Sequence, residues 1–230
     1  MEKTAADTEK DFSKEMFWET AVRTKVGKYL TDIETHFVLN AVEPLQPQMI
    51  LDIGAGAGKF SLLTAKSNIT VVSIDIVSYG LKRLQLKNPD VQVIKADARK
   101  IPLKDELFDA IIMIEVLDYI PELDQVFTDC KRTLKKEASF VFSFGNKASL
   151  KQKLRQLKGK SYLHSYKSVM KNLSKTTFKI IKKQGYNWLP FGRTSQNPLV
   201  PLFAFTEKIF GLRRLPSLSP WVIVHAAKST

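Results

Sequence analysis

Residues 51–58 read LDIGAGAG, and this stretch decides the fold that we expect. It continues an apolar run that starts at Met49 and is typical of a buried strand. Glycine recurs at every second position, at Gly54, Gly56 and Gly58, where it lets the backbone turn tightly and approach a ligand closely. A helix is expected from about Lys59. The stretch therefore predicts a loop that binds a nucleotide cofactor at the end of a first strand.

The spacing of the glycines helps to indicate which nucleotide is bound. From Asp52 the pattern is D-x-G-x-G-x-G, whereas a dinucleotide fingerprint is G-x-G-x-x-G. Counted from Gly54, the third glycine of that fingerprint would stand at Lys59, where lysine would crowd the packing of helix on strand. A nicotinamide-dependent oxidoreductase is thus the least favoured function. A purely structural turn remains an alternative for the glycines taken alone.

Strands and helices alternate through the middle of the chain. The predicted strands are 48–53, 70–75, 91–95, 108–115 and 138–144, and the predicted helices are 58–67, 78–87 and 122–135. Several of the strands are almost wholly apolar, as expected when helices cover both faces of a parallel sheet. The pattern predicts an α/β fold with a doubly wound sheet, whose ligands bind outside the carboxyl ends of the strands.

The sequence before and after this alternating region has a less regular pattern. Residues 12–43 keep a broad apolar face, and we expect one helix that begins at Asp11, ends before Pro44 and lies over the cofactor as an N-terminal cap. After Asn146, we expect helices at 147–158, 165–174 and 199–211 and strands at 177–189 and 221–227.

Acidic side chains follow successive predicted strands. Asp75 lies about 20 residues after the glycines, where it can accept hydrogen bonds from both ribose hydroxyls, although an acid there can also cap the next helix. Asp97 with the small Ala98 suits an adenine edge, or is an ordinary loop aspartate. Glu115 and Asp118 follow the fourth strand. Several acids at strand ends in this order point to one cofactor site.

These residues together resemble the class I S-adenosylmethionine-dependent methyltransferases, over about residues 48–145. The resemblance is nearest to the small-molecule branch that shares the ubiquinone/menaquinone methyltransferase-like domain. It implies a Rossmann-like, seven-stranded, mostly parallel sheet with an antiparallel last strand. From the residues themselves we expect an N-terminal helical cap over 1–47 and a methyltransferase domain over 48–230, in which about 146–167 form a basic lid or acceptor insertion.

The resemblance also implies the cofactor and its contacts. The glycine loop would hold the methionine part of S-adenosyl-L-methionine, and the acid after the second strand would hold its ribose. The residues after the third strand would contact its adenine, and those after the fourth strand would lie near its methyl group. The residues concerned are Asp52, Gly54, Ala55, Gly56, Asp75, Ile76, Asp97, Ala98 and Glu115.

Three histidines are the other candidates for chemistry. His36, His164 and His225 are far apart in sequence and form no metal-ligand pattern, so no metal is expected. His164 lies in a polar aromatic stretch after the fifth strand and is the candidate for a catalytic base, or else an exposed loop residue. His36 lies beside Phe37 on the predicted N-terminal helix, where packing is favoured over the alternative that it reaches the pocket. We expect His225 to be structural.

Charge is distributed very unevenly. The net charge is +13, yet residues 1–137 hold 19 Lys+Arg against 22 Asp+Glu, whereas residues 138–230 hold 17 Lys+Arg and one acid, Glu207. This split favours an anionic partner. We expect an anionic small-molecule acceptor, such as a lipid- or nucleotide-linked metabolite, and peripheral membrane contact through basic residues 147–160. The alternative is that the lysines only keep the protein in solution.

The function predicted from the sequence is methyl transfer to a small-molecule acceptor, with oxygen as the expected target. An RNA methyltransferase is disfavoured because no N-P-P-Y-like motif follows the fourth strand, and nucleic acid is not an expected partner. A non-catalytic membrane- or partner-binding module that keeps the fold is the remaining alternative. A single cysteine, Cys130, interpreted as a packing residue, and a polar N-terminus without a signal peptide predict a cytoplasmic protein.

Overall fold

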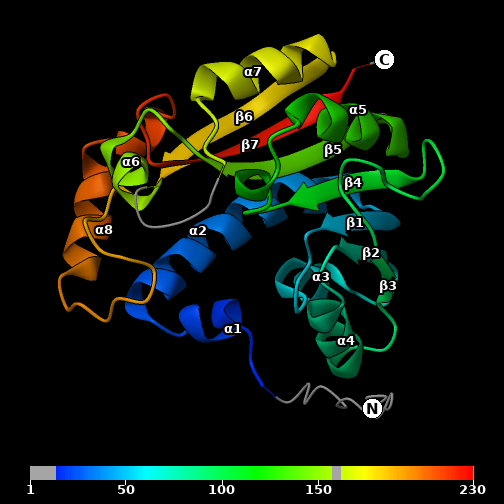
Figure 1. Cartoon of the computed structure of the whole chain (residues 1–230), viewed down its shortest axis with the longest axis horizontal. Helices are drawn as coiled ribbons and strands as arrows, with labels where there is room; N and C mark the ends of the chain where they lie inside the picture. Colours follow the sequence, from blue (N-terminus) through cyan, green and yellow to red (C-terminus); the bar gives the residue numbers. More distant parts are fainter. Residues whose placement is uncertain (1–13, 157–161, 230) are drawn as a thin grey trace, which may run out of the picture.

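A seven-stranded sheet with helices on both faces forms the molecule (Figure 1). The computed structural model describes residues 14–156 and 162–229. The strands are β1 (Met49–Ile53), β2 (Thr70–Asp75), β3 (Gln92–Lys95), β4 (Phe108–Met113), β5 (Leu134–Gly145), β6 (Phe178–Tyr186) and β7 (Trp221–Lys228). Their order across the sheet is β3-β2-β1-β4-β5-β7-β6.

All neighbouring strands from β3 to β5 pair in parallel, and β7 runs antiparallel to both β5 and β6. This confirms the predicted α/β sheet with its antiparallel last strand. The chain moves outward from β1 through β2 to β3, and then returns to place β4 on the other side of β1. The connections that follow β1 and β4 therefore diverge, which opens a crevice at the carboxyl ends of these strands.

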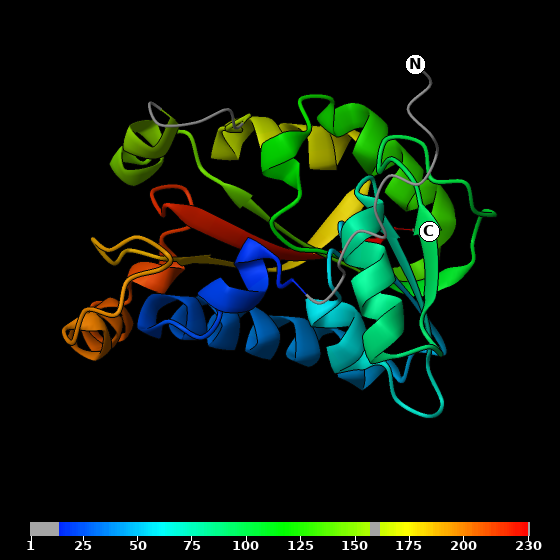
Figure 2. The ribbon, with the colours of Figure 1, turned by 60° about the horizontal axis from the view of Figure 1, so that its bottom comes forward.

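Helices cover the sheet in two layers, which Figure 2 shows above and below the strands. They are α1 (Phe17–Ala21), α2 (Lys25–Val42), α3 (Lys59–Thr64), α4 (Ser78–Lys87), α5 (Leu123–Thr133), α6 (Leu150–Gln156), α7 (Tyr166–Lys175) and α8 (Val200–Ile209). One buried cluster joins α5 and α7 to the sheet, and a second joins α2, α3 and α8 to its other face. The apolar central strands lie between these clusters, as their composition predicts.

The predicted single N-terminal helix is wrong, because the chain breaks it between Ala21 and Lys25. Thr24 caps α2 by accepting a hydrogen bond from the Gly27 amide at 3.0 Å. A Cβ added at Gly27 would stand 1.8 Å from the Ala21 carbonyl oxygen, so the turn needs glycine for this close approach. The expected cap at Asp11 lies outside the described residues, and Pro44 lies in a short 3₁₀ turn directly after α2.

The two N-terminal helices have different surroundings. The apolar face of α2 is buried against the sheet, with Leu30 and Phe37 in the same cluster as Ile50 and Ile112. In contrast, α1 lies at the crevice. Other predicted boundaries are close, although α3 ends earlier than expected, at Thr64, and β5 begins directly after α5.

Candidate functional site

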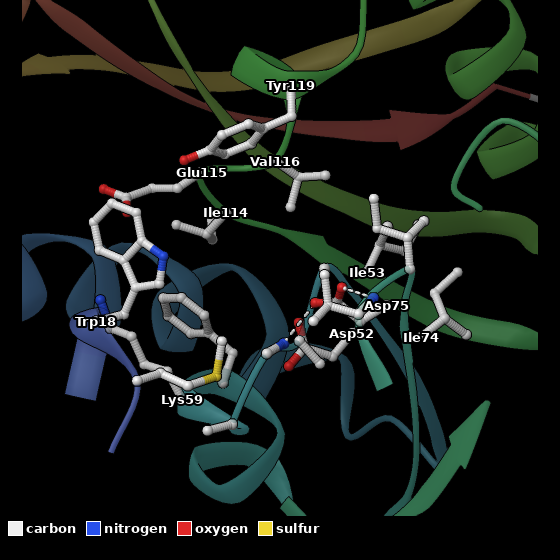
Figure 3. Close-up of a pocket in the computed structure, with 18 of the residues that line it drawn as sticks. Trp18, Asp52, Ile53, Lys59, Ile74, Asp75, Ile114, Glu115, Val116 and Tyr119 are labelled. Atoms are coloured by element: carbon white, nitrogen blue, oxygen red, sulfur yellow. Dashed lines mark hydrogen bonds between the residues drawn. The ribbon is translucent and has the colours of Figure 1, made fainter. Parts of the chain in front are cut away.

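A cavity of about 930 Å³ lies at the carboxyl ends of the central strands (Figure 3). Every residue predicted to contact the cofactor lines it, namely Asp52, Gly54, Ala55, Gly56, Asp75, Ile76, Asp97, Ala98 and Glu115. They come from the ends of four strands that are distant in sequence. The topology thus brings the predicted set together at one place, while the roles of its members stay predictions.

The three glycines of the loop serve different purposes. Gly54, Gly56 and Gly58 have φ values of 69°, 51° and 89°, a conformation that residues with a side chain rarely adopt. A Cβ at Gly54 would stand 2.2 Å from a methyl carbon of Val116, so the packing leaves no space for a side chain at this position. A Cβ at Gly56 would meet no atom of the described residues within 4 Å. The backbone at Gly56 therefore faces open space, as a loop that cradles a ligand requires.

Asp52 is buried beneath this loop. Its Oδ2 accepts a hydrogen bond from the Ser61 hydroxyl at 2.5 Å, and Ser73 donates to the same hydroxyl at 2.9 Å. Burial raises the pKa of Asp52 to about 7, and the hydrogen bond from Ser61 opposes this only in part. Asp52 therefore holds α3 against β1 and β2 and carries a proton up to near-neutral pH.

Asp75 connects the glycine loop to the start of α4. Its Oδ2 accepts from the Gly56 amide at 2.9 Å, and its Oδ1 accepts from the Val77 amide at 2.8 Å. The two interpretations of this acid are thus compatible, because a carboxylate that holds the backbone keeps further lone pairs for hydroxyl donors. Figure 3 shows Asp75 beside Asp52 on one side of the cavity.

Asp97 is held by an arginine that no sequence motif indicates. Arg99 binds the Asp97 carboxylate at 2.6 Å and contacts Glu122 at 3.1 Å. The hydrogen bond from Arg99 lowers the pKa of Asp97, so this acid stays ionised. Ala98 beside it is buried, which leaves its small side chain in the wall of the cavity.

The opposite side of the cavity combines a carboxylate, a guanidinium and aromatic rings. Glu115 has φ of 63°, and its amide donates to the Ser143 hydroxyl at 2.9 Å. Arg193 forms an ion pair with Glu115 and lies over the Trp18 ring at 4.9 Å. Figure 3 shows Glu115 and Trp18 on this side, with Tyr119 next to them. Burial lowers the pKa of Arg193 from its ordinary value, while Glu34 opposes the shift.

Helix α1 is held over the cavity by a charged anchor that no motif indicated. Glu19 of α1 binds Arg83 and Lys87 of α4 at 2.8 and 2.7 Å. Burial raises the Glu19 pKa, but hydrogen bonds from the two cations outweigh it and hold the pKa at about 2. The carboxylate is therefore ionised at any physiological pH, and its ion pairs place Trp18 in the cavity wall.

Lys59 does not crowd the helix against the strand as the sequence suggested. Its amine reaches back to Glu34 of α2 at 2.6 Å, and the same carboxylate accepts from the Tyr186 hydroxyl at 2.9 Å. Glu34 is fully buried. Lysine at this position thus joins α3 to α2 across the rim of the cavity, a long-range contact that sequence spacing does not reveal.

His164 does not line the cavity. Its Nε2 lies 2.8 Å from the Ile120 carbonyl oxygen and 3.1 Å from that of Leu117. The histidine therefore supports the loop after β4 from behind, and this geometry does not favour a catalytic base. The aromatic stretch does reach the cavity, through Tyr162.

The other two histidines and the cysteine considered above lie away from the cavity. His36 is exposed on α2, contrary to the expected packing role. The ring of His225 is hydrogen-bonded to the Ser139 hydroxyl between β7 and β5, at 2.7 Å. Cys130 is fully buried in α5, and burial raises the pKa of its thiol. Both observations agree with the expected packing role.

Comparison with known families decides the class of this site. The family described as "Methyltransferase domain" matches residues 51–142. Residues 51–142 are a methyltransferase domain. This confirms the resemblance to a methyltransferase family over these residues. S-adenosylmethionine as the cofactor stays a prediction. The match covers the glycine loop and the strand ends that follow it.

Curated relatives share the same region. The chain is 30% identical to a ubiquinone biosynthesis O-methyltransferase of Paracidovorax citrulli, over 47% of this chain and 48% of that one. It is 28% identical to a malonyl-[acyl-carrier protein] O-methyltransferase of Geobacter sulfurreducens, over 48% and 43%. These alignments thus span less than half of each relative.

A solved structure extends the likeness of the methyltransferase domain to the whole fold. A putative sarcosine dimethylglycine methyltransferase from Galdieria sulphuraria superposes with a TM-score of 0.64 at 19% identity, over 86% of this chain and 85% of that one.

Within the described residues, no helix has the length and hydropathy needed to cross a membrane.

Proposed function

We propose that this methyltransferase domain transfers the methyl group of S-adenosylmethionine to an oxygen of a small-molecule acceptor that is anionic and partly apolar. Residues 1–47 would act as a cap, 48–230 as the catalytic domain, and about 146–167 as a basic segment on the acceptor side. The single observation that carries the proposal is the cavity itself, because acids at the strand ends line one side of it and an arginine with aromatic rings lines the other.

The cofactor end fits S-adenosylmethionine. The open space at Gly56 leaves room for the methionine part, and the Asp75 carboxylate suits the ribose hydroxyls. Asp97 and Ala98, which also line the cavity, would contact the adenine edge. The bound cofactor would supply a methyl group on a sulfonium, which is already an activated electrophile.

The other end suits an anion with an apolar body. Arg193 supplies a planar guanidinium, which binds carboxylates and phosphates well, and it is held between Glu115 and Trp18. Trp18 and Tyr119 supply aromatic surface on the same side of the cavity. An acceptor whose oxygen is already ionised needs alignment and exclusion of water more than it needs a strong base.

The size of the cavity supports two ligands. Binding sites for one small molecule span about 300–1,000 Å³, and this cavity lies near the upper limit. A cofactor at the glycine loop would therefore leave space beside Glu115 and Trp18. Names of relatives agree with this type of reaction, since two of them are O-methyltransferases.

The experiment is methyl transfer from labelled S-adenosylmethionine to a panel of carboxylates, phenols and lipid- or nucleotide-linked phosphates, with RNA included as a competing acceptor. For the acceptor that is methylated, Arg193→Gln should raise KM at least about tenfold, because a charge-assisted hydrogen bond is lost. The affinity for S-adenosylmethionine should stay unchanged.

Lys104→Gln is the matched control, since Lys104 is an exposed lysine away from the cavity, and it should leave KM unchanged. If the Arg193→Gln variant keeps the wild-type KM for every methylated acceptor, the proposal that the acceptor is anionic is wrong. Methylation of RNA in preference to every small molecule would overturn the acceptor class altogether.

A further inference from the structure

Helix α8 exposes an apolar face to solvent. Leu202, Phe205 and Ile209 follow one another at helical spacing and are 56%, 58% and 62% exposed. The opposite face of the same helix is already used, because Val200 and Glu207 are buried against the molecule. The exposed residues are therefore additional to those that attach α8 to the fold.

The exposed apolar surface continues beyond the helix. We define the apolar α8 segment as residues 199–218. Its exposed large hydrophobic side chains are Leu199, Leu202, Phe205, Ile209, Phe210, Leu215 and Leu218. Phe210 is the most exposed, at 72%. Scattered apolar residues on a surface are ordinary, but such a concentration within twenty residues marks an interaction surface.

Basic side chains accompany this surface without exposed acids. Lys208 and Arg214 are exposed within the segment, and neither forms an ion pair with any other described residue. The one acid of residues 138–230, Glu207, is buried and bound by Arg213 at 2.9 Å and by the Tyr29 hydroxyl. A partner that covered the segment would therefore need to be both apolar and negatively charged.

The segment is directly connected to the cavity wall. Arg193 lines the cavity, and Leu199 lies six residues further along the chain. The connection is held to the start of α2, because the Thr24 hydroxyl donates to the Arg193 carbonyl at 2.7 Å and the Val26 amide donates to the Ser195 carbonyl at 3.2 Å. A partner bound at the apolar α8 segment would therefore lie near the acceptor end of the cavity.

Helix α6 adds to the same end of the molecule. Figures 1 and 2 both place α6 and α8 at one end, away from α4. Leu150 and Leu154 of α6 are 73% and 55% exposed, and Lys153 between them is also exposed. Lys151 instead donates to Asn187 and to the Leu189 carbonyl, so the basic charge of α6 is partly committed within the fold.

We propose that the apolar α8 segment docks onto the surface of an anionic lipid bilayer, with α8 lying in the interface. Helices of this kind insert their apolar side chains at the headgroup boundary while nearby lysines and arginines bind acidic lipids. A second copy of the chain is the less suitable occupant, because it would bring two basic surfaces together. Docking does not depend on methyl transfer, so the two proposals can fail separately.

The test is co-sedimentation of the full chain with vesicles of phosphatidylcholine alone or mixed with phosphatidylglycerol. We expect binding to the mixed vesicles that weakens at high salt. The triple variant Phe205→Gln, Ile209→Gln, Phe210→Gln should lose at least about tenfold in partitioning. Leu86→Gln is the matched control, since Leu86 is 72% exposed on α4, and it should bind like the wild type.

A second variant tests the charge. Lys208→Gln with Arg214→Gln should lower partitioning onto mixed vesicles by about thirtyfold, because each basic residue near an anionic surface contributes a similar favourable increment. Unchanged affinity for S-adenosylmethionine would verify that each variant is folded. The proposal is overturned if the wild type binds neither vesicle, or if the triple variant binds as well as the wild type. It is also overturned if sedimentation velocity finds a dimer that the triple variant dissociates while vesicles are not bound.

Discussion

At the scale of single residues, the site depends on carboxylates with very different surroundings. Asp52 is buried beneath the loop, Asp75 holds two backbone amides, and Asp97 is paired with Arg99. Their common origin at strand ends made them predictable, because parallel strands deliver successive acids to one edge. Trp18 was not predictable, since no motif surrounds it and only tertiary contacts bring it to the cavity.

Asp75→Asn should weaken S-adenosylmethionine binding by about ten- to a hundredfold, because charged acceptors form stronger hydrogen bonds with hydroxyl donors than neutral ones do. Isothermal titration calorimetry would measure this. Asp90→Asn, at an exposed aspartate after α4, is the control and should leave the dissociation constant unchanged. Equal affinities for Asp75→Asn and the wild type would remove Asp75 from the cofactor contacts.

Asp52 should give the protein a characteristic dependence of stability on pH. Its pKa is about 7 in the folded protein against an ordinary 3.8, so the folded state binds the proton more tightly. The stabilisation is complete below about pH 3.8 and is lost as pH rises through about 7. Relative to Asp52→Asn, the unfolding free energy of the wild type should fall by up to about 4 kcal/mol over that range.

Urea unfolding of both proteins, without cofactor, at several pH values would measure this difference. Comparison with Asp52→Asn removes the contributions of other groups, such as Glu19, which act equally in both proteins. A difference between the two unfolding free energies that is constant with pH would contradict the raised pKa of Asp52.

At the scale of elements, the central strands and helices were predictable because both their apolar patterns and their turn residues are local. β2 and α4 have the predicted bounds, Thr70–Asp75 and Ser78–Lys87. The break between α1 and α2 was not predictable, because it depends on the approach of Ala21 to Gly27 and on contacts of Thr24 with the distant Arg193. Apolar periodicity continues through the break and conceals it.

The position of α1 depends on the anchor at Glu19. Glu19→Gln removes the charge that binds Arg83 and Lys87, so the amides of α1 should exchange with deuterium at least about tenfold faster. In the wild type the anchor should persist above pH 4.5 and weaken as pH falls through about 2.

Hydrogen exchange followed by mass spectrometry would measure the protection of Phe17–Ala21. Glu43→Gln, which removes a solvent-exposed ion pair with Lys66, is the matched control and should leave that protection as it is. Unchanged protection in Glu19→Gln would mean that contacts other than these ion pairs hold α1.

At the scale of the whole molecule, a buried polar contact joins three distant segments. Glu34 of α2 receives Lys59 from the start of α3 and the Tyr186 hydroxyl from the end of β6. Burial, reinforced by the charge of Glu34, raises the pKa of Tyr186 well above its ordinary value, so the tyrosine remains a donor. The charge split of the sequence indicated a basic half, yet this network at the rim of the cavity could not be predicted from composition.

Tyr186→Phe should lower the free energy of unfolding by about 1–3 kcal/mol, because it leaves the buried Glu34 carboxylate with one partner fewer. Chemical denaturation would measure the loss. Tyr79→Phe removes an exposed hydroxyl bond to the Lys14 carbonyl and should cost much less. Equal losses in the two variants would show that the Glu34 contact adds little to the stability of the whole molecule.

The central claim is that the open space at Gly56 receives S-adenosylmethionine, and calorimetric titration of the cofactor tests it most directly. The wild type should bind one cofactor per chain, and Gly56→Ala should bind it at least about tenfold more weakly, because its methyl group enters the space and its backbone is strained. Gly192→Ala, where an added Cβ likewise meets no described atom within 4 Å, should bind like the wild type. Absence of binding to the wild type, or equal affinity in Gly56→Ala, would contradict the account.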